Sequence, residues 1–272
     1  MLKQRILTAL VIGPLAFALV FLAPPEYFRA AISVIWLLSS LEYARLANLR
    51  QVGTAALVIV QAVIFLLLFK NWNGVFALSI PILTAACLTW CLMLLRLVTF
   101  RPGRPPPFGY SILGFACAIA SMTFAWVALA ALRDYPSGQF LILCLLLIVW
   151  AADIGAYFAG IRFGGRRLAP EISPSKTWSG FWGGFAASVA VAAIFALAMN
   201  SLGAGPLALA AVAGVTMLAS VGGDLFISLQ KRTVGLKDTG SLLPGHGGML
   251  DRFDSLVAAA PFFALGMLLL SR

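Results

Sequence analysis

Charged residues are scarce in this chain of 272 residues. Lys, Arg, Asp and Glu make up 10% of it, hydrophobic residues make up 62%, and the mean hydropathy is +1.00. A water-exposed surface needs more charge than this, so the composition excludes an ordinary soluble domain. No basic soluble surface remains either, which excludes binding to nucleic acid.

Histidine and cysteine are also scarce, with one His and four Cys. Cys87, Cys91, Cys117 and Cys144 all lie in apolar runs with no His or acid nearby. We interpret them as small buried residues rather than as disulfides or metal ligands. Because there is no Cys/His cluster, a zinc site is excluded.

Long apolar runs dominate the chain, and they do not alternate as the strands of a barrel would. Each has about the 17–25 residues that a membrane-spanning helix needs. The runs cover residues 6–23, 28–44, 53–69, 74–95, 110–132, 139–158, 178–199, 206–228 and 253–270. They predict an all-α integral membrane protein with about nine transmembrane helices. We expect a single polytopic membrane domain (1–272), in which 1–150 is mostly apolar spans and 151–272 carries the chemistry.

The basic residues predict the orientation of these spans. If the N-terminus is cytoplasmic, fifteen of the nineteen bases fall in inside segments, and only Arg29, Lys70, Arg133 and Arg272 fall outside. This asymmetry follows the positive-inside rule. It predicts a multi-pass protein of the cytoplasmic (inner) membrane with its C-terminus outside. The basic inner face would lie against anionic membrane lipids.

Three features of the spans have a structural interpretation. Glu42 ends the second run, and we expect it to pair locally with Arg45. The proline-rich stretch 101–109 cannot be helical, so it is a connector without chemistry. The FWGG stretch at 181–184 is typical of close helix packing.

Polar chemistry gathers in residues 223–255. Asp224, Ser228 and Lys231 are spaced i, i+4 and i+7, so they share one helix face near the inner surface. Asp251 and Asp254 follow at the start of the last run. Carboxylates combined with substrate phosphates suit Mg2+, and a second cation remains open. A folding ion pair for Asp224 and a helix N-cap for Asp254 also remain open.

The stretch PGHGG at 244–248 is a flexible turn between these acids. The backbone N–H groups of Gly247 and Gly248 could cradle phosphate oxygens, and His246 could donate a hydrogen bond to one. Nearby bases could neutralise a polyphosphate, although each also fits a positive-inside signal: Lys231, Arg232, Lys237 and Arg252.

A second inner segment is complementary to the first. Asp153 lies near the end of the sixth run, where an acid is costly, and Lys176 lies in SPSKTW before the seventh run. We expect these two residues to contact substrate on a second wall of the same site.

Residues 228–254 resemble the signature of the phosphatidate cytidylyltransferases, also called CDP-diacylglycerol synthases. The matching positions are Ser228, Lys231, Arg232, Lys237, Asp238, Leu243, Pro244, Gly245, His246, Gly247, Gly248, Asp251, Arg252 and Asp254. Residues 152–178 also resemble the family. Gln230 departs from the family pattern, which usually has an apolar residue there.

The resemblance implies transfer of a cytidylyl group from CTP to phosphatidate, with Mg2+ on Asp224 and Asp251. It also implies which residues take part in catalysis and which bind the substrates. The catalytic residues would be Asp224, Lys231, Asp251 and Asp254. The substrate-binding residues would be Asp153, Lys176, Ser228, Arg232, Lys237, Asp238, His246, Gly247, Gly248 and Arg252.

Other functions remain open from the residues alone. One is a related CTP-dependent enzyme acting on another lipid, either a polyprenol kinase or an isoprenoid-lipid cytidylyltransferase. Another is an ion-coupled transporter, which is disfavoured because the polar groups cluster at one face and no tandem repeat is evident. A homodimer is open as well.

Overall fold

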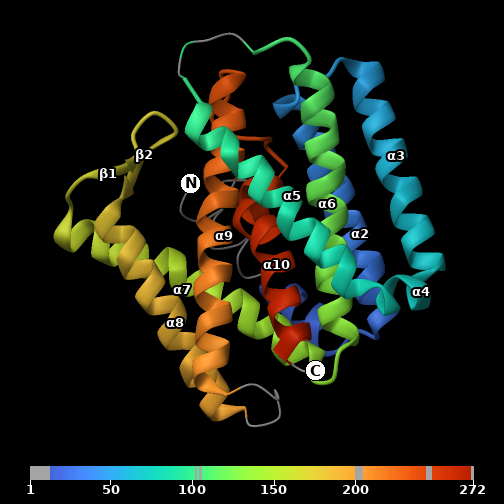
Figure 1. Cartoon of the computed structure of the whole chain (residues 1–272). Helices are drawn as coiled ribbons and strands as arrows, with labels where there is room; N and C mark the ends of the chain where they lie inside the picture. Colours follow the sequence, from blue (N-terminus) through green and yellow to red (C-terminus); the bar gives the residue numbers. More distant parts are fainter. Residues whose placement is uncertain (1–12, 102, 104–105, 200–204, 243–246, 271–272) are drawn as a thin grey trace.

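The computed structural model describes residues 13–101, 103, 106–199, 205–242 and 247–270. Helices dominate this part of the chain (Figure 1). Residues 13–21 are helical, and the elements that follow are α2 (Pro25–Leu46), α3 (Gln51–Lys70), α4 (Trp72–Ala77), α5 (Ser79–Thr99), α6 (Tyr110–Asp134), α7 (Gly138–Phe163), β1 (Arg167–Ala169), β2 (Ser173–Thr177), α8 (Trp178–Ala198), α9 (Pro206–Thr233) and α10 (Leu250–Leu270).

Seven helices of the described residues are long and apolar enough to cross a membrane, namely α3 and α5 to α10. This confirms the class of an all-α integral membrane protein and leaves the count of nine as a prediction. The first expected span begins outside the described residues. The second corresponds to α2, which is not among the seven.

The predicted start of the span at 74–95 is wrong. The chain instead forms the short helix α4, and the membrane-length helix α5 begins at Ser79. Pro81 explains the break, because proline lacks an N–H and is tolerated in the first turn of a helix, where that donor has no partner. The indole Nε1 of Trp72 donates to Asp134, which anchors α4 beside the end of α6.

The centre of the molecule is formed by α6 and α10, with α2 and α9 packed against them. In each of the two central helices, 56% of an 18-residue apolar stretch is buried inside the protein. In α3, which lies at the edge of the bundle in Figure 1, only 17% of such a stretch is buried. Trp36, Trp126 and Phe263 are completely or almost completely buried in this core. The outer face of α3 is therefore available to lipid.

Helices α7 and α8 form a pair at one side of the bundle, and the segment that connects them forms an antiparallel hairpin of β1 and β2 (Figure 1). The predicted close packing of 181–184 is confirmed. A Cβ added to Gly183 would lie 2.2 Å from the Cβ of Ala159 on α7, and one added to Gly184 would lie 2.6 Å from the carbonyl oxygen of Ala152. The two backbones therefore approach closely, as small residues allow in membranes.

Candidate functional site

Two ion pairs join the predicted acids and bases at one end of the bundle. Lys176 on β2 pairs with Asp224 on α9, and Lys231 on α9 pairs with Asp251 at the start of α10, with 2.9 Å between Nζ and Oδ1. The first pair confirms that the segment around Lys176 meets the segment around Asp224. Residues far apart in the sequence thus form one charged group.

Asp224 is held on both oxygens. Lys176 donates to Oδ2, and Ser228, one turn further along α9, donates to Oδ1 at 3.2 Å. The contact with Ser228 confirms the predicted shared face. Lys231 turns instead to α10, so the ion-pair partner of Asp224 comes from the hairpin and not from its own helix.

Asp251 is held more completely. Lys231 donates to its Oδ1, while the backbone N–H groups of Thr239 and Gly248 donate to its Oδ2 at 2.9 and 3.0 Å. Only 6% of this side chain is exposed. The N–H of Gly248, which we expected to face a phosphate, therefore serves a carboxylate of the protein in this structure.

Gly247 has a φ of +82°, a conformation that favours glycine. A Cβ there would lie 3.0 Å from Oδ2 of Asp251. Gly247 and Gly248 therefore both allow the chain to fit closely around Asp251.

Two further acids adjoin these pairs. Asp153 on α7 is exposed and interacts electrostatically with Lys176 and Asp224. Asp254 on α10 interacts with Asp224 and with both lysines. Four carboxyl groups thus lie around two lysine ammonium groups: Asp153, Asp224, Asp251 and Asp254 beside Lys176 and Lys231.

The other predicted residues lie at the margin. Arg232 donates from Nε to the carbonyl of Ile172, at 3.3 Å, and so ties the hairpin to the end of α9. Lys237, Asp238 and Arg252 are exposed, and their side chains make no hydrogen bond or ion pair with the described part of the chain. His246 lies outside the described residues.

Glu42 is a part of this region that we did not predict. Its Oε1 accepts from the N–H of Met249 at 3.0 Å, and its Oε2 accepts from the N–H of Leu250 at 2.8 Å and from the hydroxyl of Thr239 at 3.0 Å. The expected pair with Arg45 is therefore wrong. An acid at the inner end of an apolar run was the available signal, but its partners lie about two hundred positions further along the chain.

Gln230, the departure from the family pattern, also has a partner from α2. Its Nε2 donates to the hydroxyl of Tyr43 at 2.7 Å, and both residues are buried. The amide therefore links α9 to α2.

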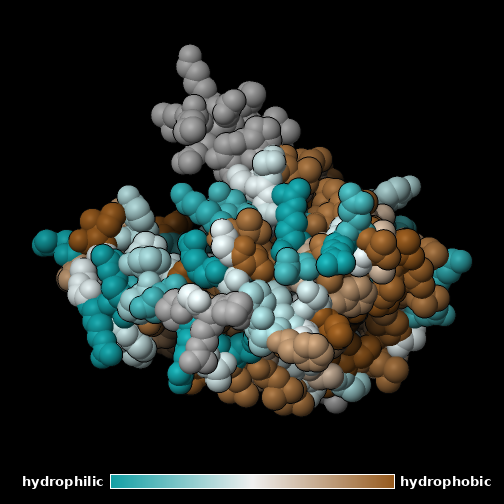
Figure 2. Space-filling view, turned by 90° about the horizontal axis from the view of Figure 1, so that it is seen from above, coloured by the Kyte–Doolittle hydropathy of each residue, from teal (hydrophilic) through white to brown (hydrophobic). Residues whose placement is uncertain are grey.

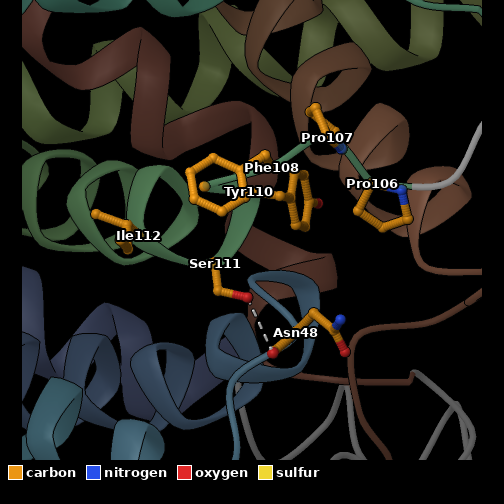
Figure 3. Close-up of a pocket in the computed structure, with 8 residues that line it drawn as sticks. Asn48, Pro106, Pro107, Phe108, Tyr110, Ser111 and Ile112 are labelled. Atoms are coloured by element: carbon orange, nitrogen blue, oxygen red, sulfur yellow. Dashed lines mark hydrogen bonds between the residues drawn. The ribbon is translucent and has the colours of Figure 1, made fainter.

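A shallow hollow of about 340 Å³ lies elsewhere on the molecule, between the proline-rich connector and the end of α2 (Figure 3). The hydroxyl of Ser111 donates to the carbonyl of Asn48 at 3.2 Å, and that of Tyr110 to Leu46 at 2.8 Å. The hollow contains none of the predicted site residues. These contacts fix α6 to the end of α2.

Seen from above, many hydrophilic side chains lie across the left and middle of the molecule, and hydrophobic side chains gather at the right and lower parts of the view (Figure 2). Within the described residues, no three His, Cys, Asp or Glu side chains converge closely enough to hold a metal ion by themselves. A Mg2+ ion here would need substrate phosphates among its ligands, as is usual for this ion.

Sequence comparisons relate this chain to known proteins. The sequence model of the cytidylyltransferase family matches residues 3–270. A phosphatidate cytidylyltransferase of Pseudomonas aeruginosa is 41% identical over 97% of this chain and 96% of its own length. Those of Haemophilus influenzae (35%, covering 97% and 98%) and Mycobacterium bovis (32%, covering 95% and 86%) are also similar over most of both chains. This chain belongs to the cytidylyltransferase family.

Proposed function

We propose that this protein transfers the cytidylyl group of CTP to phosphatidate, giving CDP-diacylglycerol and pyrophosphate. The observation that carries the proposal is the contact of Lys176 with Asp224 beside the pair of Lys231 with Asp251. Acids and bases from two distant segments of the chain thus lie together at one end of the bundle. The full-length relatives named phosphatidate cytidylyltransferase support the same substrate pair.

The reaction brings two anions together, so charge neutralisation and alignment should dominate catalysis. An oxygen of the lipid phosphate forms a bond to the α-phosphorus of CTP, while the bond from that phosphorus to the oxygen bridging to the β-phosphorus breaks. Pyrophosphate leaves with the electron pair. The lipid phosphate is already an anionic nucleophile, so no general base is assigned.

The bases would hold the phosphates. Lys176 and Lys231 are in place beside the acids, and Arg232, Lys237 and Arg252 are exposed bases of the same segment as Lys231, residues 223–255. We propose that Ser228 and His246 orient phosphate oxygens. Asp238 and the turn at Gly247 and Gly248 remain predicted substrate contacts.

Mg2+ is proposed at Asp224 and Asp251, and their hydrogen bonds fit this role. A carboxylate offers about four lone-pair positions. Asp224 uses one on each oxygen, and Asp251 keeps one on Oδ1. When bound, the ion would stabilise the departing pyrophosphate.

We also propose that this end of the bundle faces the cytoplasm, where CTP is available, and that the membrane is the inner membrane. The proposal rests on the distribution of basic residues.

The test is an assay of purified protein with phosphatidate, Mg2+ and CTP labelled either in the cytidine or at the γ-phosphate. We expect the cytidine label in the lipid and the γ-label in pyrophosphate. Removal of Mg2+ with EDTA should abolish the product, and added Mg2+ should restore it. Folded protein that leaves the lipid free of cytidine label would refute the proposal.

A further inference from the structure

Glu42 is unusual because it is a buried acid in the mostly apolar first half of the chain. Only 6% of the residue is exposed, and no lysine or arginine among the described residues forms an ion pair with it. Its charge is instead balanced by three donors, two of which are N–H groups at the start of α10. The start of a helix favours a negative charge, so Glu42 from α2 caps α10.

Glu42 and Asp251 both lie against Thr239 and Gly248. Thr239 donates its hydroxyl to Glu42 and its N–H to Asp251. Gly248 donates its N–H to Asp251, and a Cβ there would lie only 2.4 Å from Oε2 of Glu42. We call these four residues, Glu42, Thr239, Gly248 and Asp251, the carboxylate clamp.

The clamp determines where the acids of α10 lie. The backbone N–H groups of Met249 and Leu250 donate hydrogen bonds to Glu42, and this holds the adjacent Asp251 facing Lys231. The same turn of α10 carries Asp254 near Asp224. The apolar half of the chain thereby contributes to the geometry of a site whose predicted members all lie after residue 150.

We propose that Glu42 is a positioning residue for cytidylyl transfer, which it supports through the carboxylate clamp without touching either substrate. The inference rests on the proposed function. A carboxylate can accept from all three donors, whereas the amide of glutamine offers one acceptor oxygen and turns an NH2 group toward the others. Glu42→Gln should therefore loosen the start of α10 while retaining side-chain volume.

The experiment measures KM for CTP in Glu42→Gln and in a matched control, Glu26→Gln. Glu26 lies at the other end of α2 and is exposed. We expect KM to rise about tenfold in Glu42→Gln, because a hydrogen bond to a buried charged group is worth about a factor of ten or more, and to stay unchanged in the control. A purely structural role would lower the active fraction, and so the apparent kcat, without changing KM. An unchanged KM in folded Glu42→Gln would overturn the inference.

Thr239→Val provides a second test if Glu42→Gln does not fold. It removes only the hydroxyl donor and keeps the N–H that Asp251 accepts, so a smaller rise of about threefold in KM is expected. An unchanged KM in this variant contradicts the role of Glu42. The wild-type protein in the same assay separates the two proposals, since an inactive wild type rejects the proposed function, and an active wild type with unaffected variants rejects the clamp.

Discussion

At the residue scale, the carboxylates of the site differ in what holds them. Asp251 is bound by a lysine and two backbone N–H groups, and Glu42 by three donors without a salt bridge. Asp224 has one lysine and one hydroxyl. Asp251 and Glu42 thus accept hydrogen bonds from backbone N–H groups, whereas Asp224 keeps more of its oxygen lone pairs available for a ligand.

Asp224→Asn should lower the rate of CDP-lipid formation by at least about 100-fold, since loss of one charge-stabilising group costs this order in kcat. The neutral amide also cannot form an ion pair with Lys176. Initial rates with labelled CTP at several Mg2+ concentrations would measure the effect.

Asp134→Asn is the matched control. Asp134 pairs with Arg29 at 2.6 Å on another part of the molecule, at the end of α6. We expect turnover per folded molecule to stay near the wild-type value in this variant. Similar rates in Asp224→Asn and Asp134→Asn would argue against a role of Asp224 in the reaction.

Gly248→Ala should inactivate the protein, because the new methyl group would lie 2.3 Å from the hydroxyl oxygen of Thr239 and 2.4 Å from Glu42. Crowding of this kind costs about 1–3 kcal/mol. Gly74→Ala is the control, since nothing lies within 4 Å of a Cβ there. Activity and thermal unfolding in detergent report on both variants, and a fully active Gly248→Ala protein would contradict the described packing.

At the element scale, the position of Lys176 depends on the pairing of α7 with α8. Small residues bring the helix backbones together, and the hydroxyl of Ser188 on α8 donates to the carbonyl of Ile148 on α7 at 2.9 Å. The hairpin between them carries Lys176 to α9. A change in the spacing of α7 and α8 should therefore reach the site.

Gly183→Val should separate α7 from α8, since even one added methyl group would lie 2.2 Å from the Cβ of Ala159. We expect the unfolding temperature to fall by roughly 5 °C, from an overpacking cost of about 1–3 kcal/mol, together with a loss of cytidylyl transfer. Differential scanning fluorimetry and the labelled-CTP assay measure the two effects. Gly74→Val serves as the control, and equal behaviour of the two variants would refute this account.

At the scale of the whole molecule, the described helices place Lys70 at the end of α3, beside the linker to α4, and Arg167 in the hairpin that carries the site. Both are exposed. The distribution of basic residues predicts that Lys70 is outside and Arg167 is cytoplasmic.

This orientation can be tested with Lys70→Cys and Arg167→Cys, each in a chain whose four native cysteines are replaced by alanine. A membrane-impermeant maleimide should label the first variant in intact spheroplasts and the second only after the membrane is opened. The reverse pattern would invert the predicted topology.

Much of the fold was predictable, because a membrane-spanning helix needs a long apolar run and the runs are visible directly. The structure places the end of α6 within two residues of the predicted boundary and α8 within one. The break before α5 was missed because an apolar run contains no hydropathy signal for a bend, although Pro81 indicated one. The short hairpin was missed because its sequence resembles a loop.

The acids and bases were also identifiable from the sequence, because charge is rare in this chain and the candidates gather at the ends of predicted spans. Helical spacing was enough to bring Ser228 to Asp224. It could not reveal that Lys231 binds Asp251 on another helix, or that Glu42 binds the start of α10, since such contacts depend on which helices pack side by side.

The sequence by itself determined the membrane class, most helix positions and the identity of the charged residues, since each follows from local composition and spacing. Only the tertiary structure decided which acid meets which base. The lysine partner of Asp251, the acid partner of Lys176 and the donors to Glu42 lie from 20 to about 200 positions away, and packing of the helices selects them among all the groups the chain offers.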